Sequence, residues 1–215
     1  MLPGPANILT CPFCGGEKRV MTLSSGNTFG GTVWSDTRRD YPMMPEVSPV
    51  QQCPHCKKYY FIEQAQSRYE DDPNHTSFME LGKLCLSQLL EAKKQMNNLT
   101  LTKMQRWILN HQIFLAYNDI YRRNADKEVV IPADDERVQY GKSIQGLLDG
   151  IEENHNYELF HAELLRETGN FEEASRILEN HKSNDDKWVV DAMQRHINDK
   201  DTEPFLLINK GKQVK

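Results

Sequence analysis

The sequence has no apolar run long enough to cross a membrane and no excess of positive charge. Its 215 residues include 26 Lys and Arg against 31 Asp and Glu, a net charge of −5 at pH 7. A membrane-spanning helix needs about 20 mostly apolar residues in a row, and broad capture of nucleic acid depends on clustered Lys and Arg. We therefore expect no membrane partner and no general affinity for nucleic acid.

The motifs of common catalytic sites are also missing. The sequence contains no nucleophile elbow, no phosphate-binding glycine loop and no His-Glu-x-x-His helix. The first residues lack the basic segment and the continuous apolar segment of a signal peptide. These absences lead us to expect a cytoplasmic protein that is not an enzyme.

Cysteine is scarce, yet four of the five cysteines form two closely spaced pairs. Cys11-Pro12-Phe13-Cys14 and Cys53-Pro54-His55-Cys56 are separated by thirty-eight residues. Each Cys-x-x-Cys turn directs two sulfurs toward one point, and two such turns supply the tetrahedral set that zinc favours. The pattern predicts a structural Zn²⁺ site with Cys11, Cys14, Cys53 and Cys56 as ligands. Such a closed site leaves no position at which a substrate is activated.

Two other interpretations of these cysteines stay open. Rubredoxin-like iron also uses two Cys-Pro-x-Cys turns; Gly15 follows the first turn in that style, whereas Lys57 follows the second. The second pair also resembles the active site of thioredoxin-fold disulfide oxidants, whose reactive thiolate lies at a helix N-terminus. The fifth cysteine, Cys85, lies in an apolar helical stretch and is predicted to be a small core residue.

Short strands are predicted around the two cysteine pairs. Segments 19–23, 28–35 and 59–62 have strand-like composition, and several Pro and Gly residues interrupt the region between them. We predict that residues 1–72 form a zinc-ribbon domain with a long insert between the cysteine pairs. A domain of this size buries little apolar surface, so metal binding is expected to supply much of its stability.

From residue 73 onward the apolar residues recur at helical spacing, and residues 73–215 are predicted to form a helical domain. Ser77 with Glu80, and Thr102 with Gln105, match capping boxes that open helices. The first helix is expected to run to about Met96. Further helices are predicted from about residue 134, within 156–181 around a Gly-centred turn, and over 185–198, followed by a strand or docked tail at 204–208. The fold class is α+β, a four-cysteine ribbon followed by a helical bundle.

The segment around the Gly-centred turn resembles half of a tetratricopeptide repeat. The matching residues are Leu165, Gly169, Phe171, Ala174 and Leu178. Together with the Cys-Pro-x-Cys pairs, this segment resembles a group of uncharacterised bacterial zinc-ribbon proteins with a repeat-like helical region, known as a domain of unknown function. The resemblance implies a bacterial, non-catalytic protein and supplies no catalytic residues.

The insert between the cysteine pairs is the predicted binding surface. It combines an aromatic anchor, cations and flexible thioethers, which are residue types common at interface hot spots. The candidates are Trp34, Arg38, Arg39, Tyr41, Met43 and Met44. In the alternative interpretation, Trp34 and Met44 cover the ribbon core or pack on the helices.

The leading hypothesis is therefore a zinc-binding interaction or scaffold protein with an unidentified protein partner. A nucleic-acid-binding ribbon is the alternative, with Arg38, Arg39, Lys57 and Lys58 contacting phosphates and the aromatic residues 59–61 stacking on bases. A thiol redox protein comes third. The sequence predicts no particular oligomeric state.

Overall fold

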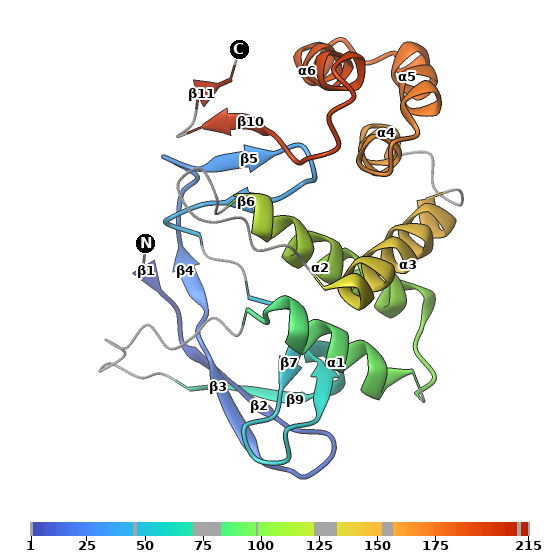
Figure 1. The fold of residues 1–215 in the computed structure, drawn as a ribbon. Helices are drawn as coiled ribbons and strands as arrows, with labels where there is room; N and C mark the ends of the chain where they lie inside the picture. Colours follow the sequence, from blue (N-terminus) through green and yellow to red (C-terminus); the bar gives the residue numbers. More distant parts are fainter. Residues whose placement is uncertain are drawn as a thin grey trace. The chain divides into compact units, whose positions relative to one another are not determined.

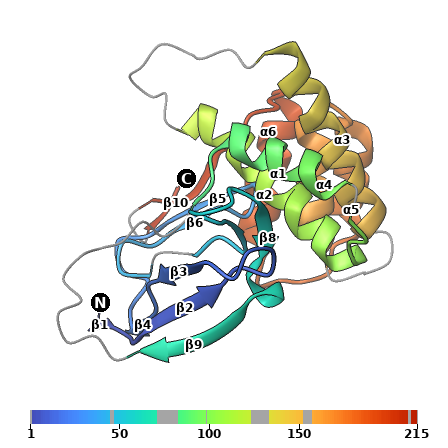
Figure 2. The same ribbon diagram turned by 90° about the horizontal axis from the view of Figure 1, so that it is seen from below.

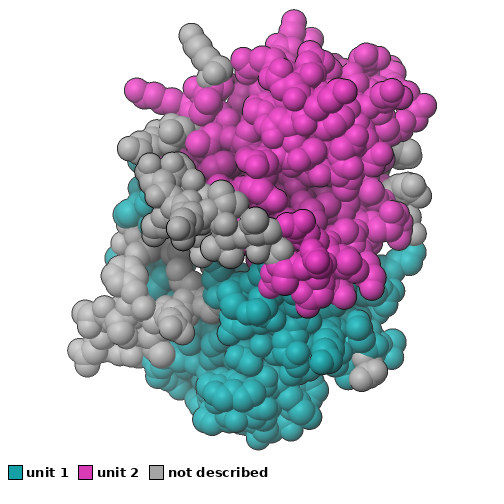
Figure 3. All heavy atoms as spheres, viewed as in Figure 1, with its two compact units in different colours: residues 1–29, 40–109 teal, residues 30–39, 110–215 magenta. Residues whose placement is uncertain are grey.

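The computed structural model describes residues 2–44, 47–70, 83–97, 99–122, 133–151, 157–209 and 212–214. The chain divides into two compact units, coloured separately in Figure 3. Unit 1 comprises residues 1–29 and 40–109, and unit 2 comprises residues 30–39 and 110–215. These units group the chain differently from the predicted division after residue 72. Residues 30–39 of the insert belong to unit 2, and residues 73–109 belong to unit 1.

Unit 1 contains three small antiparallel sheets. Strands β1 (Leu2–Pro3) and β4 (Leu23–Ser25) form one, β3 (Glu17–Val20), β2 (Ala6–Thr10) and β9 (Gln66–Glu70) form the second, and β7 (Val50–Gln52) and β8 (Tyr59–Phe61) form the third. Figure 2 shows β2 between β3 and β9. A short 3₁₀ turn, η1 (Ile62–Gln64), follows β8. The predicted strand at 59–62 is confirmed, whereas β2 and β9 were not predicted.

Helix α1 (Leu86–Met96) contributes a buried stripe to unit 1. Leu89, Ala92 and Met96 lie at helical spacing and are all nearly inaccessible, and α1 contacts β8. The predicted start at Ser77 lies outside the described residues. The prediction that Cys85 is a core residue is wrong: Cys85 is the exposed N-cap of α1, because the helix begins only at Leu86.

The capping box predicted for the second helix is confirmed. Helix α2 (Lys103–Arg122) begins after Thr102, whose hydroxyl accepts a hydrogen bond from the Gln105 N–H at 3.1 Å. The Gln105 side chain in turn accepts from the Thr102 N–H at 3.0 Å. Two N–H groups that a helix start leaves without partners are thereby satisfied.

Unit 2 combines a four-stranded antiparallel sheet with helices. The strand order is β11 (Lys212–Gln213), β10 (Leu206–Asn209), β5 (Thr32–Trp34) and β6 (Arg39–Asp40). In Figure 1, β5 and β10 run side by side although about 170 residues separate them in the sequence; Trp34 pairs with Leu206 and Val33 with Ile208. The strand predicted at 28–35 is observed over Thr32–Trp34, and the strand or docked tail predicted at 204–208 is observed as the strand Leu206–Asn209; the two pair with each other.

The remaining helices match the predicted helical segments. They are α3 (Asp134–Ile151), α4 (Glu158–Glu167), α5 (Phe171–Asn180) and α6 (Lys187–Asn198). Gly169 ends α4 with φ at 80°, and the N–H of Asn170 donates to the Leu165 carbonyl at 2.8 Å, a left-handed C-terminal cap. Ala174, Leu178 and Met193 are buried in the core that α4, α5 and α6 share. The predicted pair of helices around a Gly-centred turn is thus observed, and its relation to tetratricopeptide repeats stays a prediction.

Within the described residues, the chain is a mixture of small antiparallel sheets and six α-helices, which agrees with the predicted class at this level. None of these helices combines the length and the apolar character that crossing a membrane requires.

Candidate metal centre

The two cysteine pairs occupy matching turns of unit 1. Cys11 and Cys14 lie in the turn between β2 and β3, and Cys53 and Cys56 lie in the turn between β7 and β8. A backbone hydrogen bond closes each turn at the equivalent position. The N–H of Cys11 donates to the Gly16 carbonyl and the N–H of Cys53 to the Lys58 carbonyl, both at 2.9 Å. The two turns are therefore equivalent knuckles built on separate hairpins.

The residue after each pair adopts a left-handed backbone conformation. Gly15 has φ at 72° and Lys57 has φ at 61°. Both N–H groups donate back to the first cysteine of their pair, Gly15 to the Cys11 carbonyl at 3.0 Å and Lys57 to the Cys53 carbonyl at 3.1 Å. Lys57 thus holds, at some conformational cost, the geometry that glycine adopts freely.

The four sulfurs converge to the spacing of a tetrahedral site. All four Sγ atoms lie within 4.8 Å of one another, Cys11 and Cys56 at 3.8 Å and Cys14 and Cys53 at 3.6 Å. Zn–S bonds of about 2.3 Å in a regular tetrahedron separate the sulfurs by about 3.8 Å. All of these cysteines are free thiols. The residues therefore fit a four-coordinate metal ion, and iron would accept the same set.

Without a bound metal ion, the neighbouring thiols shift the pKa values of Cys53 and Cys14. Burial acts to raise the pKa of Cys53, but the backbone N–H groups of Cys56 and His55, together with the neighbouring thiols, lower it to about 6. For Cys14 the Gly16 N–H acts to lower the pKa, yet burial and the three other thiols raise it to about 11. Four thiolates this close together need a cation to ionise as a group.

One side of the cluster is packed and the other faces solvent. Cys11 and Cys53 are buried against Tyr60, whereas Cys14 is exposed. Burial, together with the charge of the nearby cysteines, raises the pKa of Tyr60 to about 12. Cys53 follows a strand and lies in a turn before the next strand, so it has no helix N-terminus of the kind that stabilises the thiolate in thioredoxin-type sites.

The six candidate residues of the insert are divided between the two units. Trp34, Arg38 and Arg39 belong to unit 2, and Tyr41, Met43 and Met44 belong to unit 1. Arg38 is buried and pairs with Asp119 at 3.5 Å, and the Arg122 guanidinium lies 5.6 Å from the centre of the half-buried Trp34 ring. Arg39 and Met44 are exposed, and Tyr41 and Met43 are half-buried. Trp34 and Arg38 thus have intramolecular contacts within unit 2, and a role in partner binding stays a prediction for all six.

The aromatic residues of the nucleic-acid alternative are unavailable for base stacking. Tyr59, Tyr60 and Phe61 are 4%, 0% and 1% exposed. They belong to the core of unit 1, where β8 pairs with β7 and contacts α1. Lys57 and Lys58 remain exposed.

Asp36 is fully buried in unit 2, and no motif around it predicts this burial. One carboxylate oxygen pairs with Arg122 and accepts from the Asn118 amide at 3.0 Å, and the other accepts from the Arg38 N–H at 3.1 Å. Next to it, Thr37 has φ at 74°, unusual for a β-branched residue. Its hydroxyl lies 3.0 Å from Nε2 of His111, whose pKa is lowered to about 4 by burial and by the charge of Arg38. The hairpin of residues 30–39 is therefore anchored by polar contacts to α2.

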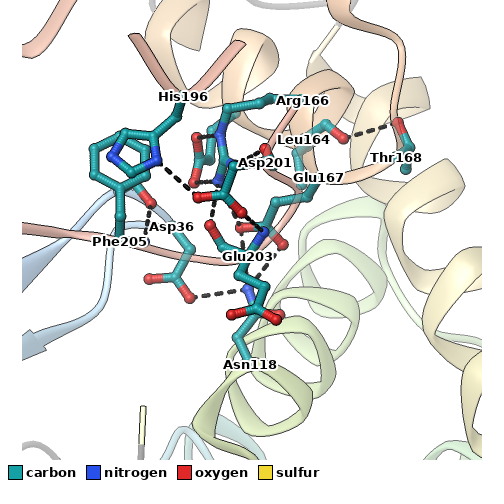
Figure 4. Close-up of polar contacts among 12 residues, drawn as sticks. Asp36, Asn118, Leu164, Arg166, Glu167, Thr168, His196, Asp201, Glu203 and Phe205 are labelled. Carbon is teal, nitrogen blue, oxygen red and sulfur yellow. Dashed lines mark hydrogen bonds and ion pairs between the residues drawn. The ribbon is translucent and has the colours of Figure 1, made fainter. Parts of the chain in front are cut away.

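A second buried polar cluster connects to Asp36 through Asn118 (Figure 4). The Asn118 amide also donates to both carboxylate oxygens of Glu167, at 2.9 and 3.1 Å. Arg166 is fully buried, and it forms a two-pronged pair with Glu163 at 2.7 and 2.8 Å. Arg166 also donates to the Glu203 carbonyl at 2.9 Å and to the Asp201 carbonyl, which fixes the segment between α6 and β10.

Glu167 is the carboxylate in excess in these clusters. Four carboxylates meet three guanidinium groups there, namely Asp36, Asp119, Glu163 and Glu167 with Arg38, Arg122 and Arg166. Burial, and then the charge of Glu163, raises the pKa of Glu167 well above its usual range, although hydrogen bonds from Tyr140 and Asn118 act against that rise.

Unit 2 also has a surface groove of about 480 Å³ on α6. Its lining combines polar and apolar side chains, and the half-buried Trp188 is one of the apolar ones. The lining residues are Trp188, Asp191, Gln194, Arg195, Asn198, Gln213 and Val214. We assign no ligand to this groove.

Comparison with known proteins adds no assignment. The chain matches no protein-family model, and neither the curated proteins nor the solved structures include a significant match. The resemblance to bacterial zinc-ribbon proteins of unknown function is supported only by the four-cysteine cluster and the presence of a helical region.

Proposed function

We propose that this chain is a non-catalytic zinc protein of the cytoplasm that binds a protein partner. The observation that carries the proposal is the convergence of four cysteine sulfurs within 4.8 Å in two matching knuckles. A four-thiolate zinc site has no open coordination position and acts by stabilising the fold. Free thiols in all five cysteines agree with a reducing compartment. The resemblance to zinc-ribbon proteins with a tetratricopeptide-like region supports a scaffold role in bacteria.

The partner surface that we propose lies on unit 1, where the exposed part of the insert presents apolar side chains. Phe29 is 81% exposed and Met44 is 41% exposed. The turn at Gly26 lies close to Met43 and Met44, since a Cβ at Gly26 would come within 2.6 Å of the Met44 side chain. Exposed aromatic and thioether side chains on neighbouring loops are typical of interaction surfaces.

The test is a binding experiment with matched surface variants. We expect the double variant Phe29→Ala and Met44→Ala to lose a partner captured by the tagged wild-type protein, with an unchanged melting temperature. Leu2→Ala is the control, because Leu2 is 59% exposed and lies in β1 of the same unit. Retention of the partner by the double variant would refute this surface.

One observation favours the nucleic-acid alternative. Phe13 in the first knuckle is 42% exposed, and the Lys58 ammonium lies 5.0 Å from the centre of its ring. An exposed ring beside a cation is the combination that stacks on a base and contacts a phosphate. A salt-dependent shift with single-stranded DNA that Phe13→Ala abolishes would establish this alternative, and its absence would remove it.

A further inference from the structure

The insert between the two cysteine knuckles connects the metal centre to the core of unit 2. Residues 15–29 and 40–52 belong to unit 1 with the cysteines, whereas residues 30–39 belong to unit 2. The chain therefore leaves unit 1 after the first knuckle, contributes a hairpin to unit 2, and returns to the second knuckle. Any restraint on the ends of the insert also acts on this hairpin.

Within unit 2 the hairpin is an integral part of the sheet and of the buried polar cluster. Strand β5 pairs with β10, the Ser35 N–H donates to the Phe205 carbonyl at 2.9 Å, and the Phe205 N–H donates to the Ser35 hydroxyl at 3.0 Å. Asp36 is fully buried between Arg122 and Asn118. Together these contacts define the docked state of residues 30–39.

In unit 1 the ends of the insert are carried by separate hairpins. Cys14 belongs to the β2–β3 hairpin and Cys53 to the β7–β8 hairpin. Besides the cysteines, polar contacts join the hairpins. Lys18 donates to the Gln51 side chain at 2.6 Å, and His55 Nε2 lies 3.2 Å from the Glu17 carbonyl. A metal ion bound to Cys14 and Cys53 closes the chain between them into a loop.

Closing this loop and docking its middle restrict the same chain segment. The entropy lost when the ends meet is smaller if residues 30–39 are already held, and the entropy lost on docking is smaller if the ends are already joined. We propose that metal binding at the four cysteines and docking of residues 30–39 in unit 2 are thermodynamically coupled. This inference rests on the metal site of the proposed function and adds that occupancy of that site regulates unit 2.

Coupling of this kind is reciprocal, so a change in unit 2 must alter the affinity for metal in unit 1. Asp36→Asn removes the buried charge of the hairpin without touching the cysteines. We expect it to weaken zinc binding by about fivefold or more in a chelator competition with the full chain. Ile144→Ala is the control, because it truncates a buried side chain of α3 but none of the polar contacts of residues 30–39.

The zinc affinities of the two variants are compared after circular dichroism has shown that both remain folded. Weaker zinc binding by Asp36→Asn alone supports the coupling. An unchanged affinity in Asp36→Asn, or an equal loss in both variants, overturns it.

Hydrogen exchange on the wild-type chain provides a test without variants. Removal of zinc by a chelator should accelerate exchange at the N–H groups of Trp34 and Ser35, which donate to the Arg38 and Phe205 carbonyls. Amides of α5 serve as the internal control and should exchange at an unchanged rate. Faster exchange around the cysteines with no change at Trp34 and Ser35 would overturn the coupling and leave the metal site intact. A chain that binds no zinc would instead refute the proposed function itself.

Discussion

The strongest stability prediction concerns the buried carboxylate of Asp36. Asp36→Asn keeps the size of the side chain and removes its charge, so that the Arg122 guanidinium, whose side chain is 5% exposed, loses the charge of its Asp36 partner. Three contacts reach the carboxylate, from Arg122, Asn118 and the Arg38 N–H. Hydrogen bonds to charged groups contribute about 1.5–3 kcal/mol each. These contributions are not additive, and the asparagine side chain still has one oxygen that can accept a hydrogen bond.

The expected magnitude follows from buried ion pairs that lose one partner. Such changes cost about 3–5 kcal/mol where the remaining charge is left unpaired. Because Arg122 keeps its ion pair with Asp119, we expect the lower end of this range, about 3 kcal/mol. This is a large share of the roughly 5–15 kcal/mol that stabilises a typical domain. The assay is urea unfolding followed by circular dichroism at saturating zinc. Glu179→Gln, at an exposed position of α5, is the matched control and should change the free energy of unfolding by no more than about 0.5 kcal/mol. A loss below about 1 kcal/mol for Asp36→Asn would refute the assignment of residues 30–39 to the core of unit 2.

Three further predictions test individual contacts. Because the pKa of Glu167 is raised in the folded state, its stabilising contribution is complete below its unfolded-state pKa of about 4.3 and is lost as pH rises toward its folded-state pKa. In parallel denaturant titrations, Glu167→Gln should therefore gain stability relative to wild type between pH 5 and pH 8. A stability difference that stays constant over this range would show that the pKa of Glu167 is not raised. Lys57→Gly should raise the melting temperature of the zinc-bound protein, since relief of about 1–2 kcal/mol of left-handed backbone strain exceeds the roughly 0.5–1 kcal/mol entropic cost of glycine. Lys57→Val should lower the melting temperature. Equal melting temperatures for both variants would exclude backbone strain at this knuckle. Arg166→Lys should accelerate amide exchange at Glu203 and Phe205, because one ammonium group cannot make the several hydrogen bonds that the guanidinium donates to Glu163 and to the Asp201 and Glu203 carbonyls. Unchanged exchange would show that other contacts hold the segment between α6 and β10.

The features predicted correctly from the sequence were local ones. The two knuckles follow from Cys-x-x-Cys spacing, the start of α2 from the capping pair Thr102 and Gln105, and the turn between α4 and α5 from Gly169. Each signal depends on residues only a few positions apart, where backbone geometry dictates which side chains meet. The long-range step that unites the knuckles was predictable because a tetrahedral metal ion needs four ligands, and each Cys-x-x-Cys pair supplies only two.

The placement of the hairpin was missed because its determinants are distant in sequence. Strand β5 pairs with β10 across about 170 residues, and Asp36 meets Asn118 across 82 positions. Arg38 resembles a surface cation in the sequence, and its burial is favourable because it pairs with Asp119 in the fold. Cys85 was misplaced for a simpler reason, since an apolar neighbourhood predicts burial but does not show where the helix begins.

We propose that Cys11, Cys14, Cys53 and Cys56 together hold one zinc ion. Elemental analysis combined with thiol titration of the native chain tests this proposal. We predict one zinc per chain and one reactive thiol, that of the exposed Cys85, with the other four thiols reacting only after the metal is removed. Iron in place of zinc would overturn the choice of metal while keeping the site. A chain without metal and with all five thiols reactive would refute the proposed metal site.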